Sequence, residues 1–221
     1  MELLELMRTR HSIRSYTDAP VSEEDITKIL QAGMLSASGK GIRPWEFIVV
    51  TDKDVLQKMS DCRAGSVKML KEAACAIVVV GNEDASDVWI EDCSAVMSNM
   101  HLMAHALGLG SCWVQGRLRK AEDGRDTEAF VRDILGYPEN CKLQAILTVG
   151  VPNEEKAPYE LDKLPMKKVH YGKFLVDNVY LKSPAGNRAG RAFLTAVSGV
   201  FLMLTNLLFR DMFRAISFSE N

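Results

Sequence analysis

A short segment near the N-terminus, Arg10-His11-Ser12-Ile13-Arg14, has two arginines and a serine at every second position. In an extended chain, side chains at alternate positions point to the same side, so Arg10, Ser12 and Arg14 would share one face. Guanidinium groups bind phosphate oxygens through paired hydrogen bonds, which gives this face the chemistry of a phosphate site. The same pattern also fits an ordinary solvated basic surface, and the segment alone does not distinguish the two.

Two small-residue stretches later in the chain could complete such a site. The first is Ser-Ala-Ser-Gly-Lys-Gly at 36–41, the small-residue loop, where the backbone can approach a ligand closely. The second is Gly-Leu-Gly-Ser-Cys-Trp-Val-Gln-Gly at 108–116, which offers backbone N–H groups beside Gly116. A phosphate site, close backbone approach and N–H donors together suit a planar heterocycle that carries a phosphate. Flavin mononucleotide (FMN) is such a molecule.

Sequence motifs for hydrolase, metal, thiol and nucleotide-binding sites are absent or incomplete. The sequence has no GxSxG, HExxH or GxxxxGK[ST] motif. His101 and His105 have the spacing of metal ligands on a helix, but no third ligand lies at a suitable distance, which favours a structural role. Cys112 follows a glycine turn without an assignable basic partner, so a buried thiol is the default interpretation. Gly108-Leu109-Gly110 lacks a third glycine and follows a helix, which argues against a Rossmann turn.

The hydrophobic pattern predicts the elements that would position these residues. Strands are expected at 46–51, 73–81, 111–114 and 143–151. Helices are expected at 2–8, 22–34, 52–59 with a loose continuation to about 72, 89–107 and 127–135. Ser22 has the character of an N-cap, and Gly108 suits a left-handed helix end. The alternation of elements indicates an α/β or α+β class with one mixed sheet covered by helices.

Composition narrows the range of partners and compartments. The 221 residues include 27 basic and 29 acidic ones, and a net charge of −2 gives no electrostatic surface for nucleic acid. The five cysteines are scattered, with no CxxC motif, so neither disulfides nor a zinc site is expected. A reducing cytoplasm fits this pattern best. The N-terminal residues include Glu2 and Glu5 and contain no apolar run, so no signal peptide is expected.

The region after residue 174 differs in composition from the rest. Residues 192–209 are 18 uncharged residues flanked by arginines. A transmembrane helix needs about 20 apolar residues, so this segment is at the lower limit. Three interpretations stay open: a membrane anchor or surface contact, a helix packed on the core or a partner subunit, and an extension without an evolved role. The first is slightly favoured. We therefore expect one domain over 1–174 and an extension over 175–221 with an apolar helix at 192–209.

Several segments, in order, resemble the FMN-dependent nitroreductase family over residues 1 to about 174. They are R-H-S-I-R-S-Y (10–16), S-G-K-G-I-R-P-W-E-F (38–47), the run from D-C-S-A-V-M to C-W-V-Q-G (92–116), L-G-Y-P (135–138), V-G-V-P (149–152) and V-H-Y (169–171). The resemblance implies an α+β fold in an intertwined homodimer, with a mixed or antiparallel sheet flanked by helices. It also implies two FMN sites at the subunit interface.

The resemblance also implies roles for single residues. Those expected at the phosphate and ribityl chain are Arg10, Ser12 and Arg14, with His11 contributing mainly backbone. Those expected to reach the flavin from the partner subunit are Ser38, Gly39 and Gly41. Those expected along the isoalloxazine ring are Val114, Gln115 and Gly116, with a backbone N–H near Gly116 facing N5. A further basic residue should assist the phosphate site; the candidate is Lys163, with Lys156 and Lys167 as alternatives.

Two positions depart from the family pattern. Gly41 stands where members often carry Asn, and Arg43 stands where they often carry Gln. The first change removes a hydrogen bond to the ring. The second adds a cation near its pyrimidine end, which could shift the flavin potential.

The implied activity passes a hydride from NADH or NADPH through FMN to a small oxidant such as a nitroaromatic, a quinone or an enone, in ping-pong order. No catalytic protein side chain and no metal is then required. Two alternatives stay open. One is different flavin chemistry on the same scaffold, such as oxygen-dependent flavin fragmentation or dehalogenation. The other is a non-catalytic flavin-binding or membrane-tethered partner protein.

Overall fold

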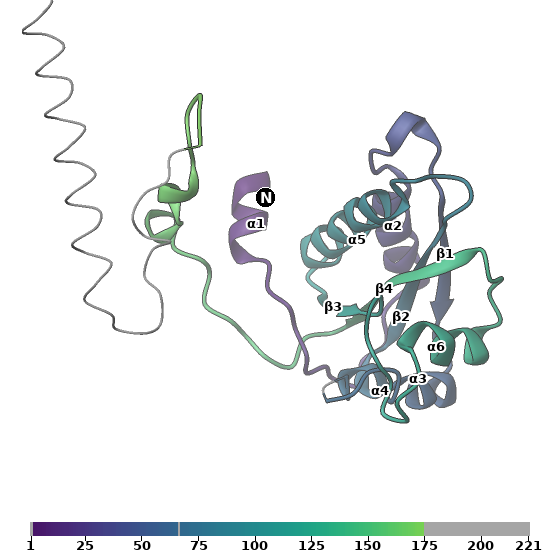
Figure 1. Ribbon diagram of the computed structural model, residues 1–221. Coiled ribbons are helices and arrows are strands. Elements are labelled where there is room, and N and C mark those ends of the chain that lie inside the picture. The colour runs from purple at the N-terminus through teal and green to yellow at the C-terminus, as the bar shows by residue number, and fades with distance from the viewer. Residues whose placement is uncertain (1, 66, 175–221) are drawn as a thin grey trace, which may run out of the picture. The chain divides into compact units, whose positions relative to one another are not determined.

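The structure is a computed structural model that describes residues 2–65 and 67–174 (Figure 1). The chain divides into two compact units, Met1–Leu164 and Pro165–Asn221. The described part of the second unit contains one 3₁₀ turn, η3 (Met166–Lys168). The predicted apolar helix at 192–209 lies outside the described residues. Within the described part of the chain, no helix is both long and apolar enough to cross a membrane.

A four-stranded sheet forms the centre of the first unit. Its strands are β1 (Trp45–Val50), β2 (Cys75–Asn82), β3 (Gly110–Gln115) and β4 (Cys141–Gly150). The spatial order is β1-β2-β4-β3, and each neighbouring pair is antiparallel. All four predicted strands are confirmed to within two residues, and the class is α+β. β2 and β4 are central, which explains why their sequences are almost continuously apolar.

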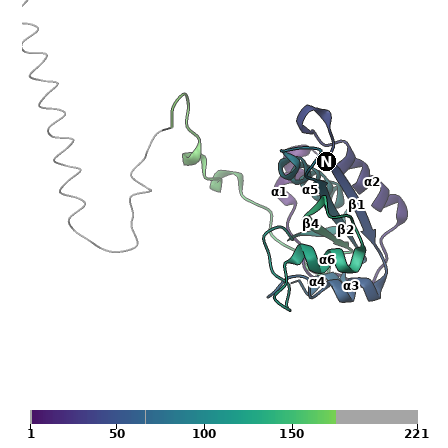
Figure 2. The same ribbon diagram turned by 45° about the vertical axis from the view of Figure 1, so that its right-hand side comes forward.

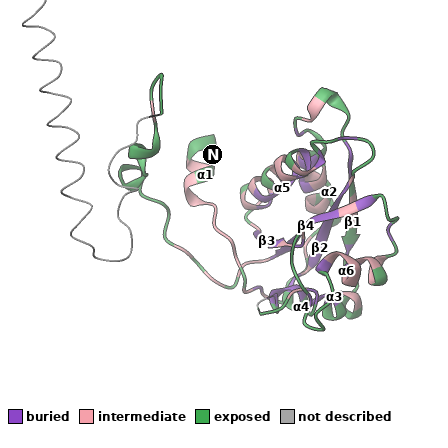
Figure 3. Ribbon diagram, viewed as in Figure 1, coloured by how far each residue is buried: buried purple, intermediate pink, exposed green. Residues whose placement is uncertain are grey.

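Helices cover both faces of this sheet. One face carries α2 (Glu23–Met34) and α5 (Trp89–Ala106); the other carries α3 (Lys53–Met59), α4 (Met69–Glu72) and α6 (Thr127–Leu135) (Figures 1 and 2). Alternate residues of β2 serve the two layers: Ile77 and Val79 pack toward α2 and α5, whereas Val78 packs with Leu56 and Met59 of α3. Burial is accordingly concentrated on the sheet (Figure 3). This arrangement leaves β3 at one edge of the sheet.

The predicted helix boundaries hold at the ends that carry specific signals. The Ser22 hydroxyl accepts a hydrogen bond from the Asp25 N–H at 3.1 Å, which confirms the N-cap of α2. Gly108 follows α5 with φ +77°, and its N–H donates to the His105 carbonyl at 2.9 Å, which confirms the left-handed end. These two caps fix where α2 begins and where α5 ends.

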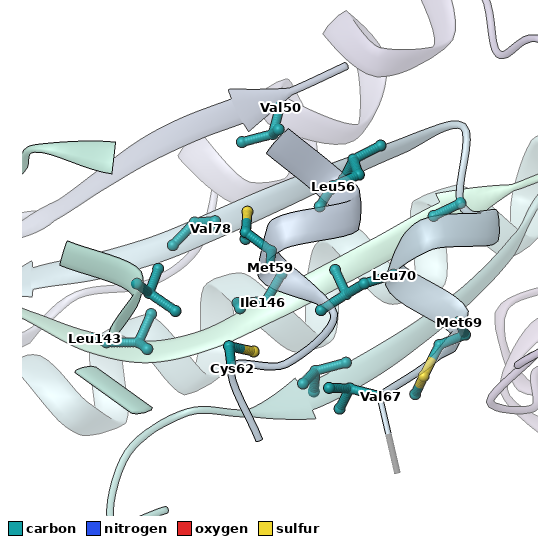
Figure 4. Packing of buried hydrophobic residues seen from close by; sticks show 14 of the residues in the cluster. Val50, Leu56, Met59, Cys62, Val67, Met69, Leu70, Val78, Leu143 and Ile146 are labelled. Atoms are coloured by element: carbon teal, nitrogen blue, oxygen red, sulfur yellow. The ribbon is translucent and has the colours of Figure 1, made fainter. Parts of the chain in front are cut away.

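The expectation of one loose helix from 52 to about 72 is wrong. The segment forms two short helices, α3 and α4, with Gly65 at φ +89° between them. A residue with this φ cannot continue a right-handed helix. Both pieces still place apolar side chains in the core, as Figure 4 shows for Met59 and Leu70. The apolar spacing therefore predicted correctly that these side chains are buried, but it did not predict the break between α3 and α4.

Candidate cofactor site

The arginine segment, residues 10–16, lies extended along the β3 edge of the sheet. Ser12 forms a parallel bridge with Ser111 of β3, and the Ile13 N–H donates to the Ser111 carbonyl at 2.9 Å. The fit is close, because a Cβ on Gly110 would lie 2.8 Å from Ile13 Cγ2. The helix α1 (Leu3–Thr9) precedes the segment, and the backbone of its C-cap residue, Arg10, is already extended. The edge strand thus fixes the register of the segment.

Arg10 contacts a buried histidine on α5. Its Nη1 lies 2.8 Å from His101 Nε2, and His101 Nδ1 is hydrogen-bonded to the Ser111 hydroxyl. Burial, assisted by the charge of Arg10, lowers the pKa of His101 from 6.5 to about 4. The ring is therefore neutral at pH 7. Because a guanidinium only donates, Nε2 accepts from Arg10 and Nδ1 carries the hydrogen that Ser111 accepts.

Arg14, at the other end of the segment, meets a different part of the fold. Its side chain is exposed, and its backbone N–H donates to the Glu154 carboxylate. That hydrogen bond, with Lys156 nearby, holds the pKa of Glu154 below its usual value. Arg14 also lines a cavity of about 510 Å³ together with Asp61, Lys68 and other residues of the α3–α4 region. The described contacts of Arg10 are thus with α5, whereas Arg14 contacts Glu154 and lines the α3–α4 cavity.

The three candidate lysines have different surroundings. Lys156 Nζ donates to the Ser12 carbonyl at 2.8 Å and lies 3.5 Å from a Glu154 oxygen, so its ammonium lies at the arginine segment. Lys163, in the 3₁₀ turn η2 (Leu161–Lys163), is exposed and pairs with Glu160 at 2.7 Å. Lys167 belongs to the second unit. Lys156 is the one that the described contacts bring to Ser12.

The small-residue loop is held by a buried carboxylate that the sequence analysis did not single out. Asp92, in the first turn of α5, is 5% exposed. Its two oxygens accept from the Ser38 hydroxyl and from the Gly39 N–H, both at 2.9 Å. The Ser38 hydroxyl in turn accepts from the Arg43 N–H at 2.8 Å. The sequence carried no distinctive signal for this role, because acidic residues in the first turn of a helix are common.

The outer part of this loop is exposed and has an unusual backbone. Lys40, Gly41 and Arg43 have φ values of +53°, +70° and +54°. Positive φ is uncommon for residues with side chains and tends to occur at ligand sites, where the surroundings hold it in place. Here the anchor is Asp92.

Replacing Asp92 with alanine should destabilise the fold by about 2 kcal/mol, because the Ser38 O–H and the Gly39 N–H lose their acceptors. We also expect faster trypsin cleavage after Lys40. Urea denaturation and timed proteolysis would measure both effects. Asp92→Asn is the matched control, since it keeps one oxygen in place and should retain most of the protection. Cleavage of Asp92→Ala at the wild-type rate would show that the carboxylate does not hold the loop.

The β3 end of the candidate site is closely packed. Val114 is fully buried in the core, and the Gln115 amide accepts from Trp113 Nε1 at 2.9 Å and donates to the Arg117 carbonyl at 3.1 Å. The Gly116 N–H makes a long hydrogen bond of 3.4 Å to the Gln144 carbonyl. A Cβ on Gly116 would lie 2.4 Å from Leu143 Cδ2, so a glycine is required for this approach.

Residues 7–67 and 60–151 match the sequence model of the nitroreductase family. The chain belongs to this family. A protein of Archaeoglobus fulgidus with the provisional name NADH dehydrogenase/NAD(P)H nitroreductase is 41% identical over 165 residues, which are 73% of this chain and 91% of that relative.

Solved structures agree with the family assignment. An FMN-dependent nitroreductase from Clostridium difficile R20291 is 42% identical, with a TM-score of 0.76 over 78% of this chain and all of that one. A provisionally named nitroreductase from Desulfovibrio desulfuricans, solved in complex with FMN, is 26% identical with a TM-score of 0.61, over 74% of this chain and 95% of that one.

The donor set of this nitroreductase-family chain fits a phosphate and the hydroxyls next to it. Two guanidinium groups belong to the arginine segment, those of Arg10 and Arg14, and the Lys156 ammonium lies at the Ser12 carbonyl between them, with the Glu154 carboxylate nearby. His11 stacks on Tyr159 with ring centroids 4.5 Å apart. Its Nε2 is buried and has no hydrogen-bond partner among the described residues. A buried nitrogen without a hydrogen-bond partner lowers folding stability unless a ligand or a water molecule supplies the hydrogen bond.

Among the described residues, no site for a metal ion or a reactive thiol compares with the candidate phosphate site. No group of three or more metal-ligating side chains occurs there. His105 is hydrogen-bonded to Thr9 at 2.8 Å, so the two histidines of α5 hold the segment around Arg10. All five cysteines are free and buried, and burial raises the pKa of Cys112, which disfavours a reactive thiolate.

Proposed function

We propose that this chain is an FMN-dependent oxidoreductase that uses NADH or NADPH. The observation that carries the proposal is the arginine segment, held in register on β3, with Lys156 beside its two arginines, in a chain of the nitroreductase family. Bound FMN would supply the redox chemistry, accepting a hydride from the nicotinamide and passing electrons to a small oxidant such as a nitroaromatic, quinone or enone. Both substrates would use one slot in turn, which gives ping-pong kinetics.

The protein's own part in this reaction is binding and orientation. Arg10, Arg14 and Lys156 bind the phosphate through charge-assisted hydrogen bonds. Ser12 is held by its bridge to β3 and lies between the two arginines in the segment, where it would contact the ribityl chain. The backbone at Gly116 would approach the ring, and a glycine is needed at this position because a Cβ would collide with Leu143 of the core.

We further propose that the small-residue loop serves the flavin of a partner subunit in a homodimer. Within one chain, α5 anchors the loop at Asp92 and the arginine segment at His101, nine positions further on. Nine helical residues span about 13 Å, so the two anchors are well separated along the axis. α1 has no buried residue and exposes Leu3, Leu4 and Met7, the kind of apolar surface that a partner subunit would cover.

Anaerobic stopped-flow spectroscopy tests the activity directly. The purified full-length protein should carry a yellow flavin that NADH or NADPH bleaches, and a nitroaromatic or quinone should restore the colour. Initial rates should give parallel double-reciprocal lines, as ping-pong order requires. A protein that binds no FMN, or a bound flavin that neither nicotinamide bleaches, would refute the proposal. The five free cysteines are consistent with a cytoplasmic location, which fractionation would test.

A further inference from the structure

Three side chains from three separate segments form a hydrogen-bonded series behind the arginine segment. Arg10 Nη1 lies 2.8 Å from His101 Nε2 on α5, and His101 Nδ1 is hydrogen-bonded to the Ser111 hydroxyl on β3. His101 is 7% exposed and Ser111 is 2% exposed, so water does not compete for these bonds. A surface arginine normally samples many rotamers. This one is fixed from behind by a rigid helix and a strand.

The series leaves most of the Arg10 guanidinium available. The guanidinium has five N–H donors, and the bond to His101 is its one side-chain hydrogen bond within the described residues. His101 is neutral and accepts, so it does not offset the positive charge as a carboxylate would. A carboxylate at this place would hold the arginine equally well but would also repel an anion in front of it. A neutral acceptor orients the cation and keeps its full charge for a ligand.

Ser111 connects this orientation to the backbone register. Its hydroxyl accepts from His101, while its carbonyl accepts from the Ile13 N–H at 2.9 Å. One residue of β3 therefore fixes both the path of the arginine segment and the histidine that holds its first side chain. Thr9, directly before Arg10, is attached to His105 one turn further along α5. The hydrogen bonds converge on the position of Arg10.

We propose that His101 is a positioning residue that holds the Arg10 guanidinium, with Ser111 as its anchor, in the orientation that binds the phosphate of the cofactor. This inference rests on the proposed function. It assigns to His101 a role that spacing on the helix did not reveal, since the i, i+4 pair with His105 suggested either metal binding or a structural role. His101 itself does not touch the phosphate.

Titration of the flavin-free, full-length protein with FMN and with riboflavin tests this role. Riboflavin lacks the phosphate. The Kd for riboflavin divided by the Kd for FMN therefore measures the contribution of the phosphate site alone. We expect His101→Leu to lower this ratio about tenfold by freeing the Arg10 side chain, with little change in riboflavin binding. His101→Gln should keep the wild-type ratio, because its amide oxygen lies near the position of Nε2 and still accepts from Arg10.

Two further variants guard against a folding defect. His101→Asn keeps a polar partner for Ser111 but is too short to reach Arg10, so it should fold and lower the ratio as His101→Leu does. Ser98→Ala changes an exposed residue of the same helix that takes no part in this hydrogen-bonded series, so it should fold and leave the ratio unchanged.

If His101→Leu and His101→Asn keep the wild-type ratio, or weaken FMN and riboflavin equally, His101 does not position Arg10 and the inference is wrong. In that case NADH or NADPH would still bleach the bound flavin of the wild-type protein, so the proposed function would stand. A wild-type protein that takes up no FMN would overturn both.

Discussion

Alanine in place of both Arg10 and Arg14 is expected to raise the Kd for FMN by about 100-fold or more. A hydrogen bond to a charged group contributes about 1.5–3 kcal/mol, and each arginine provides at least one to the phosphate. Each single variant should therefore weaken binding about tenfold or more. The expected loss is specific to affinity. Neither guanidinium is placed at the reactive part of the ring, so the rate of reduction per bound flavin should change little.

Equilibrium titration and stopped-flow reduction, both normalised to flavin content, separate these two quantities. Lys58→Ala removes an exposed cation from α3 and controls for a general change in charge. Raising the salt concentration should weaken FMN binding to the wild-type protein more than binding to the double variant, because fewer charges contribute in the latter. Full flavin content combined with a collapsed reduction rate would place these arginines at the reacting atoms and not at the phosphate.

The sequence was informative wherever one segment carried its own signal. Residues 10–14 were interpreted as an extended segment, and the structure shows this segment paired with Ser111. The shared face expected for Arg10 and Arg14 stays a prediction, because their described contacts lie with α5 and with the α3–α4 region. The continuous apolar run of β2 predicted a strand buried on both faces, and a glycine and a serine marked two helix ends. Each of these signals depends on residues within a few positions, which is the range over which backbone geometry acts.

The side chains that position the candidate site could not be found in this way. Asp92 holds a loop 53 positions earlier in the chain, and His101 holds Arg10 from 91 positions away. Both depend on how α5 packs on the sheet, which no local pattern specifies. The same limit applies to the lysines: Lys156 donates to Ser12 across 144 positions, whereas the family resemblance favoured Lys163.

Acidification should remove about 3 kcal/mol of folding stability between pH 7 and pH 4 through His101 alone. Burial, the charge of Arg10 and the neighbouring His105 lower its pKa in the folded state to about 4, against an ordinary value of 6.5. On acidification the unfolded chain therefore binds a proton first, and protonation favours unfolding. The contribution of His101 is complete above pH 6.5 and is lost progressively as the pH falls through the window down to 4.

Urea denaturation at constant ionic strength, in steps from pH 7 to pH 4, would measure this slope. The groups that face the His101 ring are Arg10 from the arginine segment, His105 from α5 and Ser111 from β3. His105 also has a lowered pKa, because of burial and Arg10, so it adds a smaller slope of the same sign. His101→Gln lacks the titrating ring and keeps an acceptor for Arg10, so it should lose most of the slope above pH 4.5. A wild-type curve parallel to that of His101→Gln would mean that the ring is not held neutral in the fold, and Arg10 would then lack its acceptor.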